Sequence, residues 1–183
     1  MTAHAQQRRS ALTSRVGAFA LTTWHALEDE PQLADPFTHV VAIDPPAGPH
    51  IDNVSGIGWT HLAWGEPELG FARRIHQWDF ALRDPLAAVY RALRGFGEAG
   101  GEALEAALRG EGPQPRSAML AGRLVRVLTE LELVALDREG PALRVLEAPA
   151  RTALERSAAY RAYQRRLEDG LRYLSSDSLR EAA

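Results

Sequence analysis

Residues 117–146, SAMLAGRLVRVLTELELVALDREGPALRVL, decide how the second half of this chain folds. Five leucine and valine residues recur there at intervals of three and four, namely Leu120, Leu124, Val127, Leu128 and Leu131. That spacing places them on one face of a helix over about 117–132. Two β-favouring runs follow, at 133–136 and 142–146, and the charged turn Asp137–Gly140 between them favours a hairpin.

Two shorter helices are expected before this stretch. Four residues share a face of the first helix, namely Leu86, Val89, Tyr90 and Leu93, and the second helix turns Leu104, Ala107 and Leu108 inward. Residues 95–101 between them are rich in glycine, and residues 110–115 form a turn. Three compact helices followed by a hairpin are the order of a winged helix, so we expect a winged-helix-like α+β domain over 85–150.

A long helix is expected at the end of the chain, over about 152–174. Five apolar and aromatic residues share one of its faces, namely Tyr160, Tyr163, Leu167, Leu171 and Leu174. The short tail after Ser175 is expected to be disordered. We therefore treat 151–183 as a third region, a C-terminal helix with its tail.

The first half shows strands alternating with helices, which is the pattern of a mainly parallel sheet covered by helices. We expect strands over 19–23, 38–43 and 59–64, and helices over 5–15, 26–33 and 66–82. The segment Asp44-Pro45-Pro46 ends the best strand because proline has no backbone donor, and residues 47–58 form a loop. Residues 1–84 are thus expected to form a Rossmann-like domain with a partial parallel sheet, so the fold class is α/β followed by the winged-helix-like domain.

Four large apolar residues of the helix over 66–82 recur at offsets of four, seven and eleven, which places them on one face: Phe71, Ile75, Trp78 and Leu82. Three tryptophans, Trp24, Trp64 and Trp78, are candidates to line a groove for a partner peptide. Large aromatics at such positions are more often part of the core, and the sequence does not distinguish the two.

The charges are unevenly distributed along the chain. All 21 basic residues are Arg, and the formal net charge of −3 argues against a uniformly basic nucleic-acid binder. Residues 1–80 hold 5 Arg and 9 acidic residues, a balance of −4, whereas residues 81–183 hold 16 Arg and 15 acidic residues, a balance of +1. A polyanion is therefore expected to prefer the second half.

Several classes of site are excluded or disfavoured. Cysteine is absent, which removes disulfides, thiolate metal sites and thiol nucleophiles. The six histidines show no metal-ligand spacing, and Ser55-Gly-Ile-Gly58 lacks the G-x-G-x-x-G fingerprint. We expect no catalytic residue, no metal site and no cofactor in this chain, and we interpret Asp44 as a turn residue. Because no apolar run is long enough for a bilayer and no secretory signal is present, we expect a cytoplasmic protein without membrane contact.

Two groups of arginines are the candidate binding residues. Arg116, Arg123 and Arg126 lie off the apolar face of the helix that enters the major groove in DNA-binding winged helices. Arg161, Arg165 and Arg172 lie together on the last helix, beside Tyr160 and Tyr163, which offer rings for base stacking. The alternatives are a solvated flank for the first group, ion pairs of Arg165 and Arg166 with Glu168 and Asp169 on the last helix, and a core role for the tyrosines.

The order of segments resembles the C-terminal region of the RecJ family of single-stranded-DNA-specific exonucleases. The similar elements are Val40-Val-Ala-Ile-Asp-Pro-Pro46, His61-Leu-Ala-Trp-Gly65, Leu82-Arg-Asp-Pro-Leu-Ala-Ala-Val-Tyr-Arg-Ala-Leu93, Leu124-Val-Arg-Val-Leu-Thr-Glu-Leu-Glu-Leu-Val134 and Ser157-Ala-Ala-Tyr160. The resemblance extends over about residues 15–174. The chain departs from the whole family in lacking the Asp-His-His motif and the Asp/His clusters that hold the catalytic Mg²⁺ or Mn²⁺.

The resemblance implies an accessory role in DNA repair and recombination, as part of an exonuclease or as a stand-alone relative of its accessory domain. The partners it implies are single-stranded DNA, the acidic tail of single-strand-binding protein and the exonuclease's catalytic core. Two other interpretations remain open. One is a free-standing winged-helix regulator that binds duplex DNA as a dimer, and the other is a small α/β enzyme that uses Asp44 and nearby histidines.

Overall fold

The computed structural model describes residues 20–49, 58–110, 114–137, 140, 142–147, 152–177 and 179. Its described residues contain six α-helices, a two-stranded parallel sheet and a three-stranded antiparallel sheet, which confirms a mixed α/β class. By their internal contacts the residues form two units, a first unit up to His76 together with the residues from Asp169, and a second unit over Gln77–Glu168. The expected domain limits at 84 and 150 stay predictions. The expected helix over 5–15, most of the loop over 47–58 and most of the tail lie outside the described residues.

The first unit begins with a short helix that follows the residues expected to form a strand and overlaps the helix expected over 26–33. Residues 20–23, the described part of the expected strand over 19–23, form no strand, so that prediction is wrong for them. Thr23 is instead the N-cap of α2 (Trp24–Asp29), and its Oγ1 accepts a hydrogen bond of 3.2 Å from the Ala26 N–H. Capping by threonine outweighs its strand propensity here, because a helix leaves its first N–H groups without backbone acceptors. The 3₁₀ helix η2 (Pro31–Ala34) follows.

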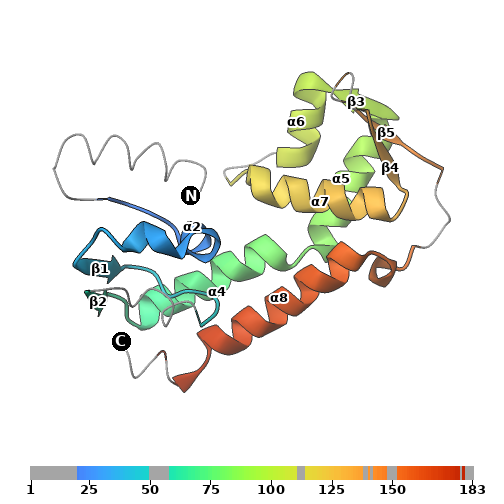
Figure 1. The fold of residues 1–183 in the computed structure, drawn as a ribbon. Helices are drawn as coiled ribbons and strands as arrows, with labels where there is room; N and C mark the ends of the chain where they lie inside the picture. Colours follow the sequence, from blue (N-terminus) through green and yellow to red (C-terminus); the bar gives the residue numbers. More distant parts are fainter. Residues whose placement is uncertain are drawn as a thin grey trace. The chain divides into compact units, whose positions relative to one another are not determined.

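The parallel sheet of the first unit consists of β1 (His39–Ala42) and β2 (Trp59–Leu62), which confirms the expected strand direction (Figure 1). Their register pairs His39 with Trp59 and Val41 with His61. At the start of β2, a side chain on Gly58 would collide with the Thr38 carbonyl, so only glycine lets the two strands begin side by side.

The core of the first unit lies on one side of this sheet. It contains Ala42, Trp64, Leu69, Leu174 and Leu179, so it draws on α4 (Glu66–Phe80) and on the end of α8 (Ala158–Leu174). Gly170 of α8 lies against the buried ring of His76, where any larger residue would clash.

The face of α4 that carries Phe71, Ile75 and Trp78 is not its buried face, since these side chains are 37%, 43% and 48% exposed. Leu69, His76 and Phe80 are buried instead. Leu69, His76 and Phe80 have the same helical offsets as Phe71, Trp78 and Leu82, so the periodicity alone does not show which of the two faces is buried.

The second unit is built from three helices and three strands. Along the chain these are α5 (Arg83–Phe96), β3 (Glu98–Gly100), α6 (Gly101–Arg109), α7 (Ala118–Glu130), β4 (Val134–Asp137) and β5 (Ala142–Val145). The strand order is β3-β5-β4, with both pairs antiparallel, and Figure 1 shows the helices beside this sheet. The strand β3 was not expected from the sequence, because its three residues Glu-Ala-Gly are too few to show a strand pattern and two glycines with positive φ, Gly97 and Gly101, bracket it.

The predicted apolar faces of the second unit are confirmed. Leu86, Val89 and Leu93 of α5 are buried, and all five residues that decided the prediction of α7 are buried as well. Ala107 of α6 completes the helical side of the core, while Val134 and Leu143 are the contributions of the hairpin. Burial of each large aliphatic side chain contributes roughly 1.5–3 kcal/mol, so this cluster is the main source of stability of the unit.

A carboxylate at the end of α7 organises the start of α8. The expected helix from Thr152 begins only at Ala158, after the 3₁₀ helix η3 (Leu154–Arg156). Glu130 Oε2 accepts hydrogen bonds from Ser157 Oγ at 2.7 Å and from the Ala159 N–H at 2.9 Å. Ser157 Oγ in turn accepts from the Tyr160 N–H at 3.0 Å. Glu130 thus caps a helix to which it is not joined in sequence, and its negative charge lies at the positive end of the helix dipole.

We predict that Ser157→Ala lowers the free energy of unfolding by about 1–2 kcal/mol, because the N–H of Tyr160 loses its cap and Glu130 loses a donor. Urea denaturation followed by circular dichroism measures the change. Ser175→Ala, an exposed serine after α8, is the control. A loss below about 0.5 kcal/mol would contradict the capping role.

The same contacts make stability depend on pH. The Ala159 N–H, followed by Ser157 and Arg126, lowers the pKa of Glu130 below its usual value. A lowered folded-state pKa stabilises the protein above the pKa of the unfolded glutamate, and this contribution is lost as pH falls through the folded-state value. We predict that the free energy of unfolding falls less between neutral and acid pH in Glu130→Gln than in the parent chain. Glu102→Gln on α6 should show the same fall as the parent. Urea denaturation at a series of pH values measures both.

Candidate nucleic-acid and acidic-tail interface

Arg116, the first candidate cation, caps the end of α6. Its Nε donates to the Leu108 carbonyl at 2.6 Å and its Nη2 donates to the Ala107 carbonyl at 3.0 Å. These carbonyls belong to the last turn of the helix, where no backbone N–H of the helix is available to donate to them. Burial lowers the pKa of Arg116. Its guanidinium therefore closes the loop between α6 and α7 and is not directed to an external anion.

Arg123 on α7 is part of the core boundary. Its side chain is only 13% exposed, and its Nη1 donates to the Asp79 main-chain carbonyl at 2.9 Å. The guanidinium carbon lies 4.1 Å from the centre of the Phe80 ring, a cation–π contact. Burial lowers the pKa of Arg123, and the Asp79 carboxylate opposes that shift. The residue ties α7 to the end of α4.

Of the three candidate arginines on and beside α7, Arg126 is the exposed one. Its Nε lies 3.2 Å from Glu130 Oε1, and this hydrogen bond is the main cause of a raised pKa. The same glutamate caps α8, so Arg126 adds one exposed but partnered charge. No basic residue occupies the other exposed positions of α7, which are Ala118, Met119, Gly122, Thr129 and Glu130.

The second group of candidates lies on α8. Arg165 is exposed, and its side chain makes no hydrogen bond or ion pair with another residue of the described ranges. Arg161 is also exposed, and its Nη1 donates to the Glu155 main-chain carbonyl, which leaves its charge without a carboxylate. Arg172 pairs with Asp169 at 3.0 Å and belongs to the first unit, so the structure does not join it to the other two in one site.

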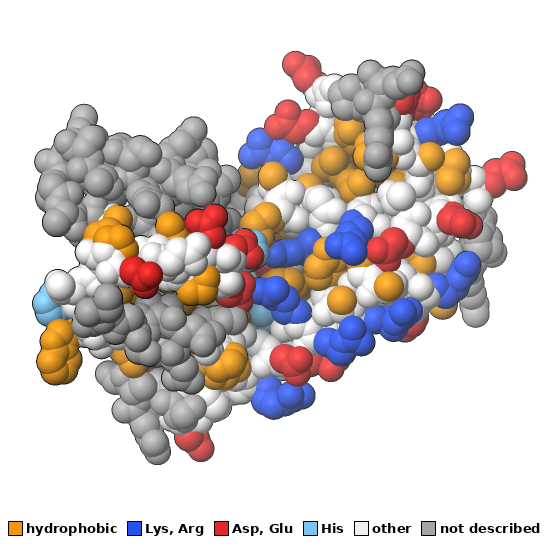
Figure 2. Space-filling model, in the orientation of Figure 1, with side chains coloured by type: hydrophobic (Ala, Val, Ile, Leu, Met, Phe, Trp, Pro, Cys, Tyr) orange, Lys and Arg blue, Asp and Glu red, His pale blue; other side chains and the backbone are white. Residues whose placement is uncertain are grey.

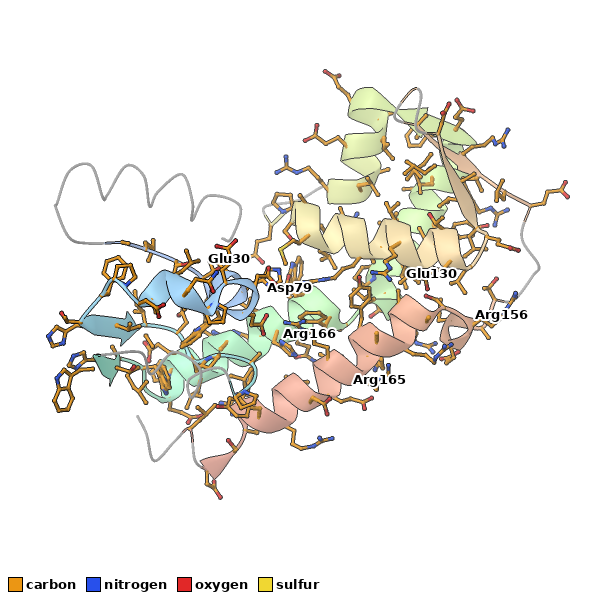
Figure 3. The ribbon with its side chains drawn as sticks, in the orientation of Figure 1. Glu30, Asp79, Glu130, Arg156, Arg165 and Arg166 are labelled. Atoms are coloured by element: carbon orange, nitrogen blue, oxygen red, sulfur yellow. The ribbon has the colours of Figure 1, made fainter. Side chains whose placement is uncertain are left out.

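Arg156 of η3 is a cation that sequence reasoning missed. It is exposed, and its side chain makes no hydrogen bond or ion pair within the described part of the chain. Its position directly before Ser157, the N-cap of α8, was the available signal, because residues that precede an N-cap lie outside the helix. We call Arg156, Arg161 and Arg165 the α8 cation row. Figure 2 shows blue side chains over α7 and α8, and Figure 3 labels Arg156 and Arg165.

The aromatic residues beside the row are not available for base stacking. Tyr160 is 5% exposed, and the half-buried Tyr163 packs against Phe80, with ring centres 6.3 Å apart. Arg166, labelled in Figure 3, lies over the Phe80 ring, and its guanidinium carbon is 5.4 Å from the centre of that ring. The row can therefore attract an anionic backbone, whereas it lacks the exposed rings that hold unstacked bases.

The remaining candidates lie in the first unit. Trp64 is buried, and the half-buried Trp24 donates its Nε1 proton to the Asp44 carbonyl at 2.7 Å, so both belong to the core. Of the three tryptophans considered for a peptide groove, Trp78 is the exposed one. The described residues contain no group of three or more His, Cys, Asp or Glu placed to hold a metal ion. No helix in the described ranges is long and apolar enough to cross a membrane.

We predict that the candidate arginines separate into two classes by stability. Arg123→Ala removes a buried hydrogen bond and a cation–π contact and should lower the free energy of unfolding by about 1–3 kcal/mol. Arg165→Ala should change it by less than about 0.5 kcal/mol, as usual for an exposed residue. Thermal and urea unfolding measure both variants, and equal losses would contradict this division.

Comparisons of the chain with protein-family models, with curated proteins and with solved structures find no match to any of them. The resemblance to the RecJ family therefore depends on the motifs quoted above.

Proposed function

We propose that this chain is an accessory binding region of a RecJ-like single-stranded-DNA exonuclease, acting in DNA repair and recombination. Its second unit is a winged-helix-like module, and its first unit is a Rossmann-like partial domain. The α8 cation row binds single-stranded DNA or the acidic tail of single-strand-binding protein. Hydrolysis occurs in a separate catalytic core that carries the divalent metals.

The strand order supports the winged-helix-like assignment. In a winged helix, the short strand between the first two helices pairs with the last strand of the hairpin, which places that last strand in the centre. The second unit has this arrangement, because β5 lies between β3 and β4 and α7 directly precedes the hairpin. Fold alone does not specify function, whereas the exposed charges indicate which surface can bind an anionic partner.

The observation that carries the proposal is the contrast between α7 and α8. Arg116 and Arg123 direct their guanidinium groups to main-chain carbonyls, and Arg126 is partnered by Glu130. The α8 cation row is exposed, and none of its members is paired with a carboxylate among the described residues. Phosphates and carboxylates both attract such groups, because binding releases counterions without first breaking an internal ion pair.

The composition of α7 disfavours readout of base sequence in duplex DNA. Direct readout needs side chains such as Arg, Asn or Gln aimed at base edges in the major groove. The exposed positions of α7 are mostly small, apolar or acidic, and Arg126 is the one basic residue among them. A sequence-independent contact with a phosphate backbone or an acidic peptide therefore fits the second unit better.

We predict that the triple variant R156A/R161A/R165A binds single-stranded DNA at least about tenfold more weakly than the parent chain. If each arginine contacts one phosphate, the slope of log affinity against log salt should fall by about 2, since each contact on a single strand contributes about 0.7. Fluorescence anisotropy with labelled oligonucleotides and with an acidic tail peptide, over a series of salt concentrations, measures both quantities.

Two controls accompany this experiment. R91A/R94A/R109A removes the same charge from exposed positions of α5 and α6 and should retain binding. R156K/R161K/R165K keeps the charge and should retain most of the salt slope, because lysine also contacts phosphates. Equal weakening by both alanine triples would show a general charge effect and would overturn the assignment to α8.

A free-standing winged-helix regulator is the second candidate, and the strand order β3-β5-β4 is the observation that favours it. This function requires duplex binding with defined half-site spacing through α7 and the hairpin. Arg126→Ala and Arg144→Ala would then reduce duplex affinity, while the α8 triple variant would leave it unchanged. Selection of bound sequences from a random duplex pool distinguishes the two functions.

A further inference from the structure

One face of the parallel sheet in the first unit is exposed along its length. Alternate residues of the paired strands share this face, because His39 pairs with Trp59 and Val41 with His61. Val41, Ile43 and Trp59 are 59%, 57% and 73% exposed. Parallel sheets in proteins are almost always covered on both faces. Exposed apolar side chains on such a sheet therefore indicate a contact with another molecule.

Two histidines lie together on this face. His39 Nδ1 and His61 Nε2 are 3.0 Å apart, both side chains are exposed, and the rings are stacked with centres 5.2 Å apart. Two histidine nitrogens bound to one tetrahedral Zn²⁺ at about 2.0–2.1 Å are about 3.3 Å apart, which is close to the separation of this pair. Binding requires both rings to turn, so that the two nitrogens point to a common ion instead of to each other. Metal binding requires each imidazole to carry its proton on the nitrogen that does not bind the ion.

The pair supplies only half of a tetrahedral ligand set. The described residues offer no third His, Cys, Asp or Glu to complete a site. A second copy of the chain would bring two more imidazoles through a two-fold axis, since such an axis places the same patch on both sides of an interface. Four histidine ligands would then satisfy Zn²⁺ without water.

Charge favours a second copy as the occupant of this face. The alternate positions 39, 41, 43, 59, 61 and 63 hold no acid and no Arg, so two copies meet there without like-charge repulsion. The rest of residues 1–80 carries a balance of −4, which makes other self-contacts of this region unfavourable. A strongly charged partner would find no complementary charge on the face.

The size of the face makes the metal necessary. A stable interface usually involves about 20–30 residues from each side, and the exposed face offers far fewer. Apolar contact alone should leave the chain monomeric, whereas metal coordination adds directional bonds at its centre. We propose that Zn²⁺ joins two copies of this chain face to face, held by His39 and His61 of each copy.

Sedimentation velocity of the full chain tests this inference, which is independent of the proposed DNA binding. We expect a dimer with one zinc ion for every two chains, and a monomer in EDTA. His39→Ala and His61→Gln should each raise the zinc concentration for half-maximal dimerisation at least about tenfold. His25→Ala, which removes another exposed histidine, should dimerise as the parent does. Circular dichroism checks that all variants are folded.

Co²⁺ provides a second measurement because its visible absorption is intense only in tetrahedral sites. The dimer with Co²⁺ should show this absorption, and both histidine variants should lose it. A monomer at every zinc concentration, zinc bound by single chains without association, a dimer that persists in EDTA, or dimerisation unaffected by both variants would overturn the proposal.

Discussion

The hydrogen bonds from Ser157 and Ala159 to the Glu130 carboxylate fix where α8 starts and against what it packs. The acceptor comes from the end of α7, so the cap is a tertiary contact and not a local one. It sets the phase of α8, which buries Tyr160 and leaves Arg161 and Arg165 on the surface. Without that anchor, the charged residues of α8 would have no defined position relative to the core.

The second unit illustrates that arginine content does not measure binding capacity. Three arginines around α7 have guanidinium groups engaged by carbonyls, an aromatic ring or a glutamate. Each engaged group satisfies a backbone or side-chain partner whose exposure would otherwise cost free energy. The arginines that remain for an external anion are exposed ones without a carboxylate partner in the described residues, among them Arg156, Arg161 and Arg165.

The first unit presents a different kind of surface. Its helices bury one face of the parallel sheet, and the opposite face combines apolar side chains with the His39–His61 pair. Neither feature alone identifies a partner, since exposed apolar residues are common and a histidine pair is an incomplete site. Their coincidence on a single uncharged face is what makes a symmetric, metal-bridged contact a specific hypothesis.

The sequence by itself determined the helices of the second unit and the hairpin, because the spacing of residues such as Leu124 and Val127 reports burial through the periodicity of the helix. It also identified the parallel strand pair. Only the tertiary structure decided that β3 exists, that α4 turns Phe71 outward, and that Arg123 is internal while Arg156 is exposed. Those outcomes depend on contacts between residues far apart in the chain, and a local pattern carries no information about which partner a polar side chain will meet.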